Sequence, residues 1–413
     1  MPAASDARSQ PLRESAAPPQ EAASRGLEEA AALALIGFAA ALQVSIAAAN
    51  ILLALCLLLW VGSMLRHGER PAVPPLFWPL LAYAALTLVS AAFSIDPRTS
   101  LVDSRQLLLL LIVPAVYRLA EGRRALRVAD VIITVGALSA IAGIVQYGIL
   151  DFDSLGRRPQ GTLGHYMTYS GLLMLVVIAG SARLLFWRSD RIWPALIMPA
   201  LLVALALTLT RSAWVGTFVG LAVLFSLRDF RMLAVLPIVA ALFVALAPSA
   251  VTDRVYSMFD VNDPSNRDRV AMMRSGARMI ADRPLTGVGP NMIPRVYDRY
   301  LDPSAVNRTN PHLHNVPMQI AAERGLPALA AWLWFLVVAV RDLWRRFRAS
   351  EMPSLAAAAL AALAAMLAAG LFEYNFGDSE FLMLLLVLLT LPFAADAIRA
   401  RAEAPPAAAS TRA

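Results

Sequence analysis

The sequence predicts an all-α, polytopic integral membrane protein with about 12 transmembrane helices and one large helical loop on the outer side. Composition is the first reason. Apolar residues make up 59% of the 413 residues and charged residues only 16%, where about 25% is usual in soluble domains. The second reason is that the apolar residues recur in blocks of roughly 20, the length that crosses a bilayer as a helix. Lipid is therefore the expected solvent of most of the chain.

The blocks divide into nine spans before residue 250 and three after residue 326. Very short turns separate some neighbours, so eleven or thirteen crossings remain possible. The predicted spans are 28–44, 46–64, 75–93, 104–119, 128–150, 166–187, 192–210, 212–228, 232–249, 326–341, 353–373 and 379–397.

Arginine placement predicts the orientation of these spans. Connections on the side shared with both termini hold fifteen arginines, and the short connections on the other side hold five. The positive-inside rule then places both termini in the cytoplasm and the long connection outside. The expected division of the chain is 1–26 as a disordered cytoplasmic tail, 27–249 as transmembrane helices 1–9, 250–326 as the outer catalytic loop, 327–397 as helices 10–12 and 398–413 as a second cytoplasmic tail.

Several function classes are excluded by composition. Basic residues are scattered through apolar sequence, so nucleic-acid binding is not expected. The single cysteine, Cys56, lies in an apolar block and has no partner for a disulfide. All 36 basic residues are arginine. Schiff-base chemistry and a phosphate-binding lysine are thus excluded, and any anion that binds to basic side chains must bind to guanidinium groups.

The outer loop is long enough to contain helices and a function of its own. A helix is expected from Asp268 to Asp282, before a glycine-rich turn over 284–290. A second helix should begin after Asn315, a good N-cap, with Pro317 in its first turn. Asn315, Gln319 and Glu323 then recur every four residues on one helical face.

These features together predict an anion site with a general base. His314 would lie at the positive end of the second helix, and an imidazole can accept a proton near neutral pH. Arg211 lies between two predicted spans with almost no loop to house its charge, which favours a functional position or interfacial snorkelling. Arg157 and Arg158 form a further outer cluster, which could contact phosphate or be ordinary loop charges.

Two other groups carry weaker signals. Asp151 and Asp153 form a DxD pattern that holds a divalent metal in some glycosyltransferases, but one short match predicts little and no metal is expected. Polar residues at the last outer turn, including Glu373, are read as a solvated rim that could also contact a sugar.

Three motifs carry a resemblance to a known superfamily. They are Thr210-Arg211-Ser212-Ala213-Trp214, Arg269 followed by Pro284 and Gly287-Val288-Gly289-Pro290, and His314-Asn315 followed by Gln319, Glu323 and Gly325. In this order, and on the outer side, they resemble the bacterial O-antigen ligases, O-antigen polymerases and protein O-oligosaccharyltransferases. The ligases are the most similar in length and in ending soon after the last span.

The resemblance implies a glycosyltransferase of the Gram-negative inner membrane whose active site faces the periplasm. An O-antigen ligase moves O-antigen polysaccharide from undecaprenyl diphosphate to a sugar hydroxyl of lipid A–core, which completes lipopolysaccharide. The reaction would be inverting and metal-independent, with no cofactor. The partners would be the lipid-linked donor, the lipid A–core acceptor and membrane lipids. An O-antigen polymerase, another lipid-linked oligosaccharide transferase or a lipid-linked glycan transporter is the alternative.

The same resemblance assigns roles to individual residues. His314 would be the general base, and Arg211 and Arg269 would bind the diphosphate. His312 is expected to point away from the reaction, and Asn315 to orient His314. Further substrate contacts are assigned to Arg267, Asn315, His312, Gln319, Arg157 and Arg158.

Overall fold

A computed structural model describes residues 19–68, 71–187 and 189–397. Within these ranges the regular elements are all helical, and one isolated bridge joins Ser154 to Arg157. The predicted all-α class is therefore confirmed for the described residues. The termini at 1–18 and 398–413, which hold most of the two predicted tails, lie outside them.

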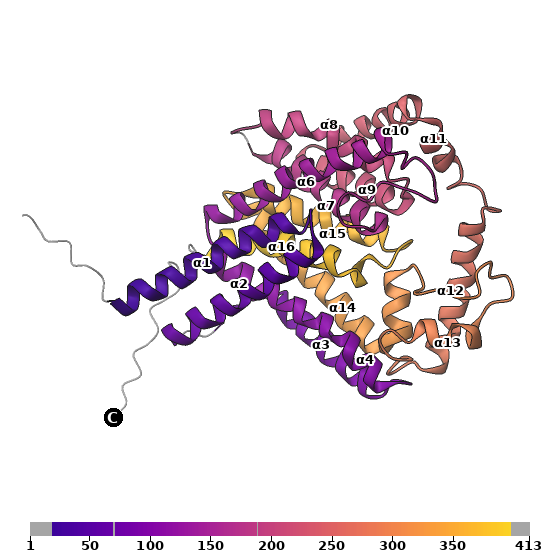
Figure 1. The fold of residues 1–413 in the computed structure, drawn as a ribbon, viewed down its shortest axis with the longest axis horizontal. Coiled ribbons are helices and arrows are strands. Elements are labelled where there is room, and N and C mark those ends of the chain that lie inside the picture. Colours follow the sequence, from indigo (N-terminus) through magenta and orange to yellow (C-terminus); the bar gives the residue numbers. More distant parts are fainter. Residues whose placement is uncertain (1–18, 69–70, 188, 398–413) are drawn as a thin grey trace, which may run out of the picture.

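The helices follow the predicted apolar blocks closely (Figure 1). Those before the outer loop are α1 (Pro19–Ala41), α2 (Ile46–His67), α3 (Phe77–Ala92), α4 (Pro97–Asp103), η1 (Ser104–Leu111), α5 (Ile112–Leu119), α6 (Arg123–Ile149), α7 (Tyr166–Phe186), α8 (Ile192–Leu207), α9 (Arg211–Arg228), η2 (Phe230–Ala234) and α10 (Val235–Leu246). Those in and after the loop are α11 (Ser249–Tyr256), α12 (Pro264–Asp282), α13 (Ile293–Tyr300), α14 (Val316–Ala349), α15 (Pro353–Ala369), η3 (Asn375–Gly377) and α16 (Ser379–Ala395).

The centre of the bundle is formed by α7, α15 and α16, whose side chains are almost all buried. The outer helices have the opposite character. Leu58 on α2, Ile192 on α8 and Leu246 on α10 are 71%, 77% and 80% exposed. Exposed apolar side chains spread over several outer helices suit contact with lipid tails. The apolar helices therefore indicate a multi-pass membrane protein.

Length and apolar composition together qualify five helical segments in the described ranges as membrane spans. They are Ile46–Arg66, Pro97–Leu119, Arg123–Ile149, Tyr166–Phe186 and Val316–Ala349. Five others are apolar but only 10–17 residues long, among them α8 and α15. The structure thus supports a helical membrane protein and leaves the expected number of 12 spans as a prediction.

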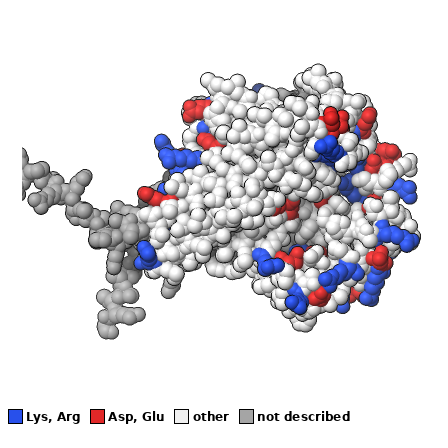
Figure 2. Space-filling model, viewed as in Figure 1, with Lys and Arg blue, Asp and Glu red and all other residues white. Residues whose placement is uncertain are grey.

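Three contacts bring distant segments together at one end of the bundle. Arg118 forms an ion pair with Glu28 of α1 at 3.2 Å, and Arg346 pairs with Asp396 at 2.7 Å. The N–H of Gly122 donates to the carbonyl of Ala394. The start of α1, the connection before α6, the end of α14 and the end of α16 therefore share this end. The helices α12 and α13 lie at the opposite end, where Figure 2 shows charged side chains gathered on the face in view.

One predicted boundary is wrong. Helix α1 begins at Pro19, so 19–26 is helical and not part of a disordered tail. Its alanine and glutamate residues are good helix formers, which the disorder interpretation neglected. The end of the outer loop at 326 stays a prediction, and α14, which begins at Val316 within the loop, has a kink at Gly325 beside that position.

Candidate functional site

The glycine-rich turn over 284–290 attaches the outer loop to the bundle at the kink of α14. Gly325 has φ 83°, which breaks the helix and frees carbonyl groups. The N–H groups of Val288 and Gly289 donate to the carbonyls of Ala322 and Glu323, both at 2.9 Å. A side chain at Gly287 would collide with the backbone of Glu323. The glycine-rich turn is therefore explained by close packing of its backbone against the backbone of α14.

The predicted start of the second loop helix is confirmed. Asn315 is the N-cap of α14, and its Oδ1 accepts from the N–H of Met318 at 2.9 Å. Its Nδ2 donates to the carbonyl of Leu371, so its amide is committed to the backbone and not to His314. Gln319 is buried, and its Oε1 accepts from the N–H of Leu313 at 2.7 Å. The hydrogen bonds of both side chains therefore stabilise the backbone turn that contains His314.

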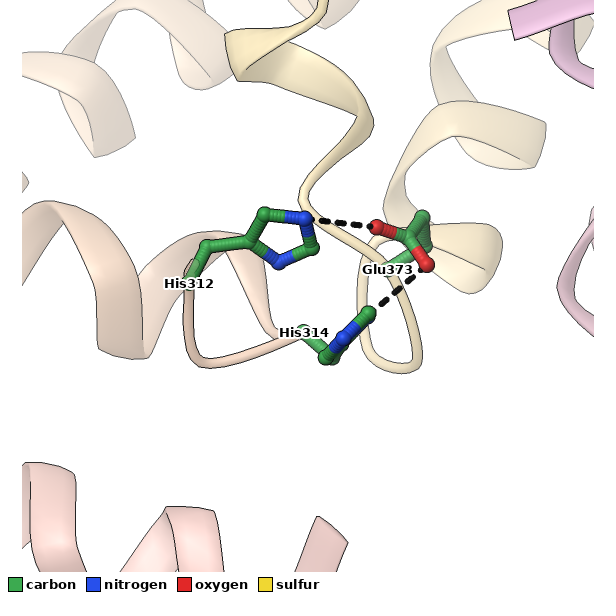
Figure 3. Close-up of side chains that lie close together, drawn as sticks. All are labelled: His312, His314 and Glu373. Carbon is green, nitrogen blue, oxygen red and sulfur yellow. Dashed lines mark hydrogen bonds and ion pairs between the residues drawn. The ribbon is translucent and has the colours of Figure 1, made fainter. Parts of the chain in front are cut away.

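Glu373, on the connection between α15 and η3, is the partner of both histidines (Figure 3). His314 Nδ1 lies 2.9 Å from Glu373 Oε2, and His312 Nε2 lies 3.5 Å from Glu373 Oε1. The two imidazole rings are 4.1 Å apart between centroids. The expectation that His312 points elsewhere is wrong. His314 adopts φ 48°, and this left-handed turn brings residues two apart toward the same carboxylate.

The environment changes the proton affinity of two members of this cluster. Burial lowers the pKa of His312 to about 4, although Glu373 opposes the change. Burial raises the pKa of Glu373, but the hydrogen bond from His314 and the nearby imidazoles more than offset it and leave that pKa below its usual range. Glu373 is thus ionised and His312 neutral at physiological pH.

Arg211 and Arg269 meet at a shared hydroxyl group. Ser265 Oγ accepts from Arg211 Nη2 at 3.0 Å and from Arg269 Nη1 at 3.3 Å. Arg211 is only 6% exposed and forms an ion pair with Asp263 at 3.4 Å. Burial lowers the pKa of Arg269, and the neighbouring Arg211 lowers it further. The carboxylates of Glu373, Asp263 and Asp268 oppose this change, so the two positive groups are held close together and are only partly compensated.

The remaining predicted arginines are distributed differently. Arg267 is exposed and lines the same cavity as Arg269. Arg157 stacks on the ring of Phe152 at 4.3 Å, which is the geometry of an ordinary loop contact. Arg158 stacks on Tyr166 at 4.3 Å, and burial followed by the charge of Arg211 lowers its pKa against the opposing effect of Tyr166. Of this pair, it is Arg158 that faces the arginine cluster.

A cavity of about 500 Å³ opens where the loop helices meet the bundle. Its polar wall includes Arg267, Arg269, His314 and Asn315. Apolar side chains also line the cavity. They include Phe259, Val261, Met273, Leu371 and Phe372, and all five are exposed. A cavity lined by both guanidinium groups and exposed apolar side chains suits an amphiphilic, anionic substrate.

Three side chains of the site could also hold a metal ion. One ligand atom from each of His312, His314 and Glu373 lies within 4.8 Å of the others. Two imidazoles and a carboxylate are ligands that suit zinc or a similar transition metal. The DxD pair of Asp151 and Asp153 is not part of this group.

Comparison with known families adds to this geometry. A family model described as O-antigen ligase matches residues 198–333. The match supports the O-antigen ligase superfamily. It contains Arg211, Arg269 and His314, and the resemblance read from the three motifs is confirmed. No curated protein matches the chain. Because the family covers O-antigen ligases and polymerases, the match supports a glycosyltransferase-like membrane enzyme that acts on lipid-linked polysaccharide.

Sequence reasoning placed Glu373 in a solvated rim and missed its contacts with the two histidines. Glu373 lies 59 positions after His314 and outside the O-antigen ligase match, so no local spacing connects them. The signal that could have found it was an acidic residue at an outer turn of an otherwise apolar region.

Proposed function

We propose that the protein is an O-antigen ligase. It transfers O-antigen from undecaprenyl diphosphate to a sugar hydroxyl of lipid A–core and completes lipopolysaccharide. The observation that carries the proposal is the single cavity lined by Arg269 and His314, with Arg211 joined to Arg269 through Ser265. This arrangement offers a diphosphate-binding group and a base on either side of one reacting carbon.

The arginines would act on the leaving group. Arg211 and Arg269, helped by Arg267, bind the diphosphate oxygens with paired, permanently charged donors. When the bond between the anomeric carbon and the phosphate oxygen breaks, the electron pair leaves with the lipid diphosphate. Fixed positive charge stabilises that developing charge without reorganisation of solvent.

His314 would act on the acceptor. Glu373 accepts a hydrogen bond from Nδ1, which leaves Nε2 free to take the proton. The acceptor hydroxyl loses its proton to Nε2 as its oxygen attacks the anomeric carbon from the side opposite the diphosphate. The anomeric configuration is therefore inverted. General-base catalysis of this kind contributes roughly 10²–10⁴-fold.

The membrane setting follows from the same proposal. The outer loop and its cavity face the periplasm, and both termini are cytoplasmic at the inner membrane. Arg118, Arg346 and both described ends of the chain share the end of the bundle opposite the cavity. This placement agrees with an arginine-rich cytoplasmic side. Guanidinium groups supply the charge stabilisation, so the reaction needs no metal or other cofactor.

A deletion strain tests the proposal against its nearest alternative. Loss of a ligase leaves bare lipid A–core, and complementation restores the complete polysaccharide. Lipid A–core capped with a single repeat unit would instead indicate an O-antigen polymerase and overturn the ligase assignment. Movement of the lipid-linked donor across vesicles without new glycosidic bonds would indicate a transporter.

A further inference from the structure

Arg254 lies beside Arg211 because the end of α11 is bonded to it. Ser257 follows Arg254 by one helical turn, and its Oγ donates to the Arg254 carbonyl at 2.9 Å. The same serine accepts from Arg211 Nη1 through its carbonyl at 3.0 Å and its Oγ at 3.2 Å. The positions of the two arginines are therefore coupled through one residue.

The guanidinium group of Arg254 has unused hydrogen-bonding capacity. In the described part of the chain it makes no ion pair, and its Nε is buried without a hydrogen-bond partner. The Nε of Arg269 is buried and unpartnered in the same way. A buried donor without a partner destabilises the protein, because it has lost its hydrogen bond to water and gained none in return. Two such donors in one cluster indicate an anion that is bound during function.

Positive charge accumulates around Arg254. Burial lowers its pKa to about 10, and the charges of Arg211 and Arg158 contribute in the same direction. Asp263 opposes this change, but its carboxylate already pairs with Arg211. Four arginines, from α9, α11, α12 and the connection before α7, thus interact with one another, and Asp263 is the carboxylate that opposes them at Arg254.

We infer that Arg254 is a further anion-binding residue, and that with Arg158, Arg211 and Arg269 it forms a site for a diphosphate. This inference rests on the proposed function and names the residue that would recognise the second phosphate of the donor. A monophosphate presents the oxygens of one phosphorus, too few for four guanidinium forks. The leaving diphosphate gains one negative charge on transfer, so an additional arginine stabilises the product more than the bound donor.

Direct binding tests the inference. Farnesyl diphosphate and farnesyl monophosphate are titrated into the detergent-solubilised full chain, with Arg254→Gln, Arg254→Lys and the exposed Arg308→Gln as a matched control. We expect Arg254→Gln to weaken diphosphate binding about tenfold and monophosphate binding less than about twofold. Arg254→Lys should be intermediate, and Arg308→Gln should match the unchanged protein. Equal weakening of both ligands, or no weakening, would overturn the inference.

Glycan transfer separates this inference from the proposed function. If Arg254→Gln weakens diphosphate binding while the unchanged protein forms no bond to lipid A–core, the proposed function fails and the binding role stands. If transfer proceeds equally well with Arg254→Gln, the binding role fails and the proposed function stands. An effect of Arg254→Gln that disappears with a dephosphorylated acceptor would assign Arg254 to the acceptor's phosphates and overturn the inference.

Discussion

Glu373 Oε2 lies 2.9 Å from His314 Nδ1, so Nδ1 is the imidazole nitrogen that contacts the carboxylate. The contact joins the region that matches the O-antigen ligase family model, residues 198–333, to a turn outside that region. Its consequence for catalysis can be tested because the two residues have separate roles in the proposed reaction.

Glu373→Ala should lower kcat by ~10²-fold or more, because His314 loses both its orientation and the charge that stabilises its protonated form. Glu373→Gln keeps a hydrogen-bond acceptor for His314, so its kcat should fall less than that of Glu373→Ala. The KM for the lipid-linked donor should stay within about twofold, because the arginines remain in place. The measurement is steady-state transfer by purified protein, with the exposed Glu351→Gln as control. A donor KM that rises while kcat is kept would contradict the positioning role.

Arg211→Ala, Arg269→Ala and His314→Ala should each abolish capped lipopolysaccharide while the protein still inserts in the membrane. The first two remove diphosphate contacts and the third removes the base. Gel analysis of lipopolysaccharide from complemented deletion strains, with immunoblots of membrane fractions, measures both outcomes. Normal product from all three variants would refute the site. His312→Ala should reduce the product less than His314→Ala, because His314, the proposed base, keeps its contact with Glu373.

Acid should destabilise the fold through His312. Its pKa in the folded protein, about 4, lies below the unfolded value of about 6.5. The unfolded chain therefore binds a proton between these values that the folded chain does not. No stability is lost above pH 6.5, and up to about 3 kcal/mol is lost as the pH falls toward 4. Thermal midpoints in detergent from pH 7 to 4.5 should fall less steeply for His312→Gln. If the thermal midpoint falls equally steeply with pH in the unchanged protein and in His312→Gln, His312 is not the source of the acid destabilisation.

Extensive dialysis against a chelator should leave transfer activity unchanged, because fixed guanidinium groups carry the charge stabilisation in the proposed mechanism. Activity is measured before and after dialysis, together with the metal content of the protein. Loss of activity that added Zn²⁺ restores would mean that the metal-independent proposal is wrong. The cluster of His312, His314 and Glu373 would then be the first candidate for the ion, ahead of Asp151 and Asp153.

Sequence patterns predicted most of the helices because local rules govern them. The apolar blocks, the stop of α12 before Pro284 and the cap at Asn315 depend on residues near one another in the chain. The pairing of His314 with Glu373 depends on a contact between distant segments, which no local pattern encodes. His312 was misplaced because residues two positions apart point in different directions on a helix, whereas His312 and His314 lie in a turn where His314 has a positive φ.

The long helix α14 gives the site an unusual mechanical setting. The helix begins at Val316, two residues after His314, is broken at Gly325 and then runs through a segment apolar enough to cross the bilayer. Tilting of the segment after Gly325 to match a thicker or thinner membrane would move the kink and change the height of the imidazole above the lipid surface. The lipid environment is thereby a determinant of how the base meets its acceptor, and membranes of different thickness should support different rates with the same polypeptide.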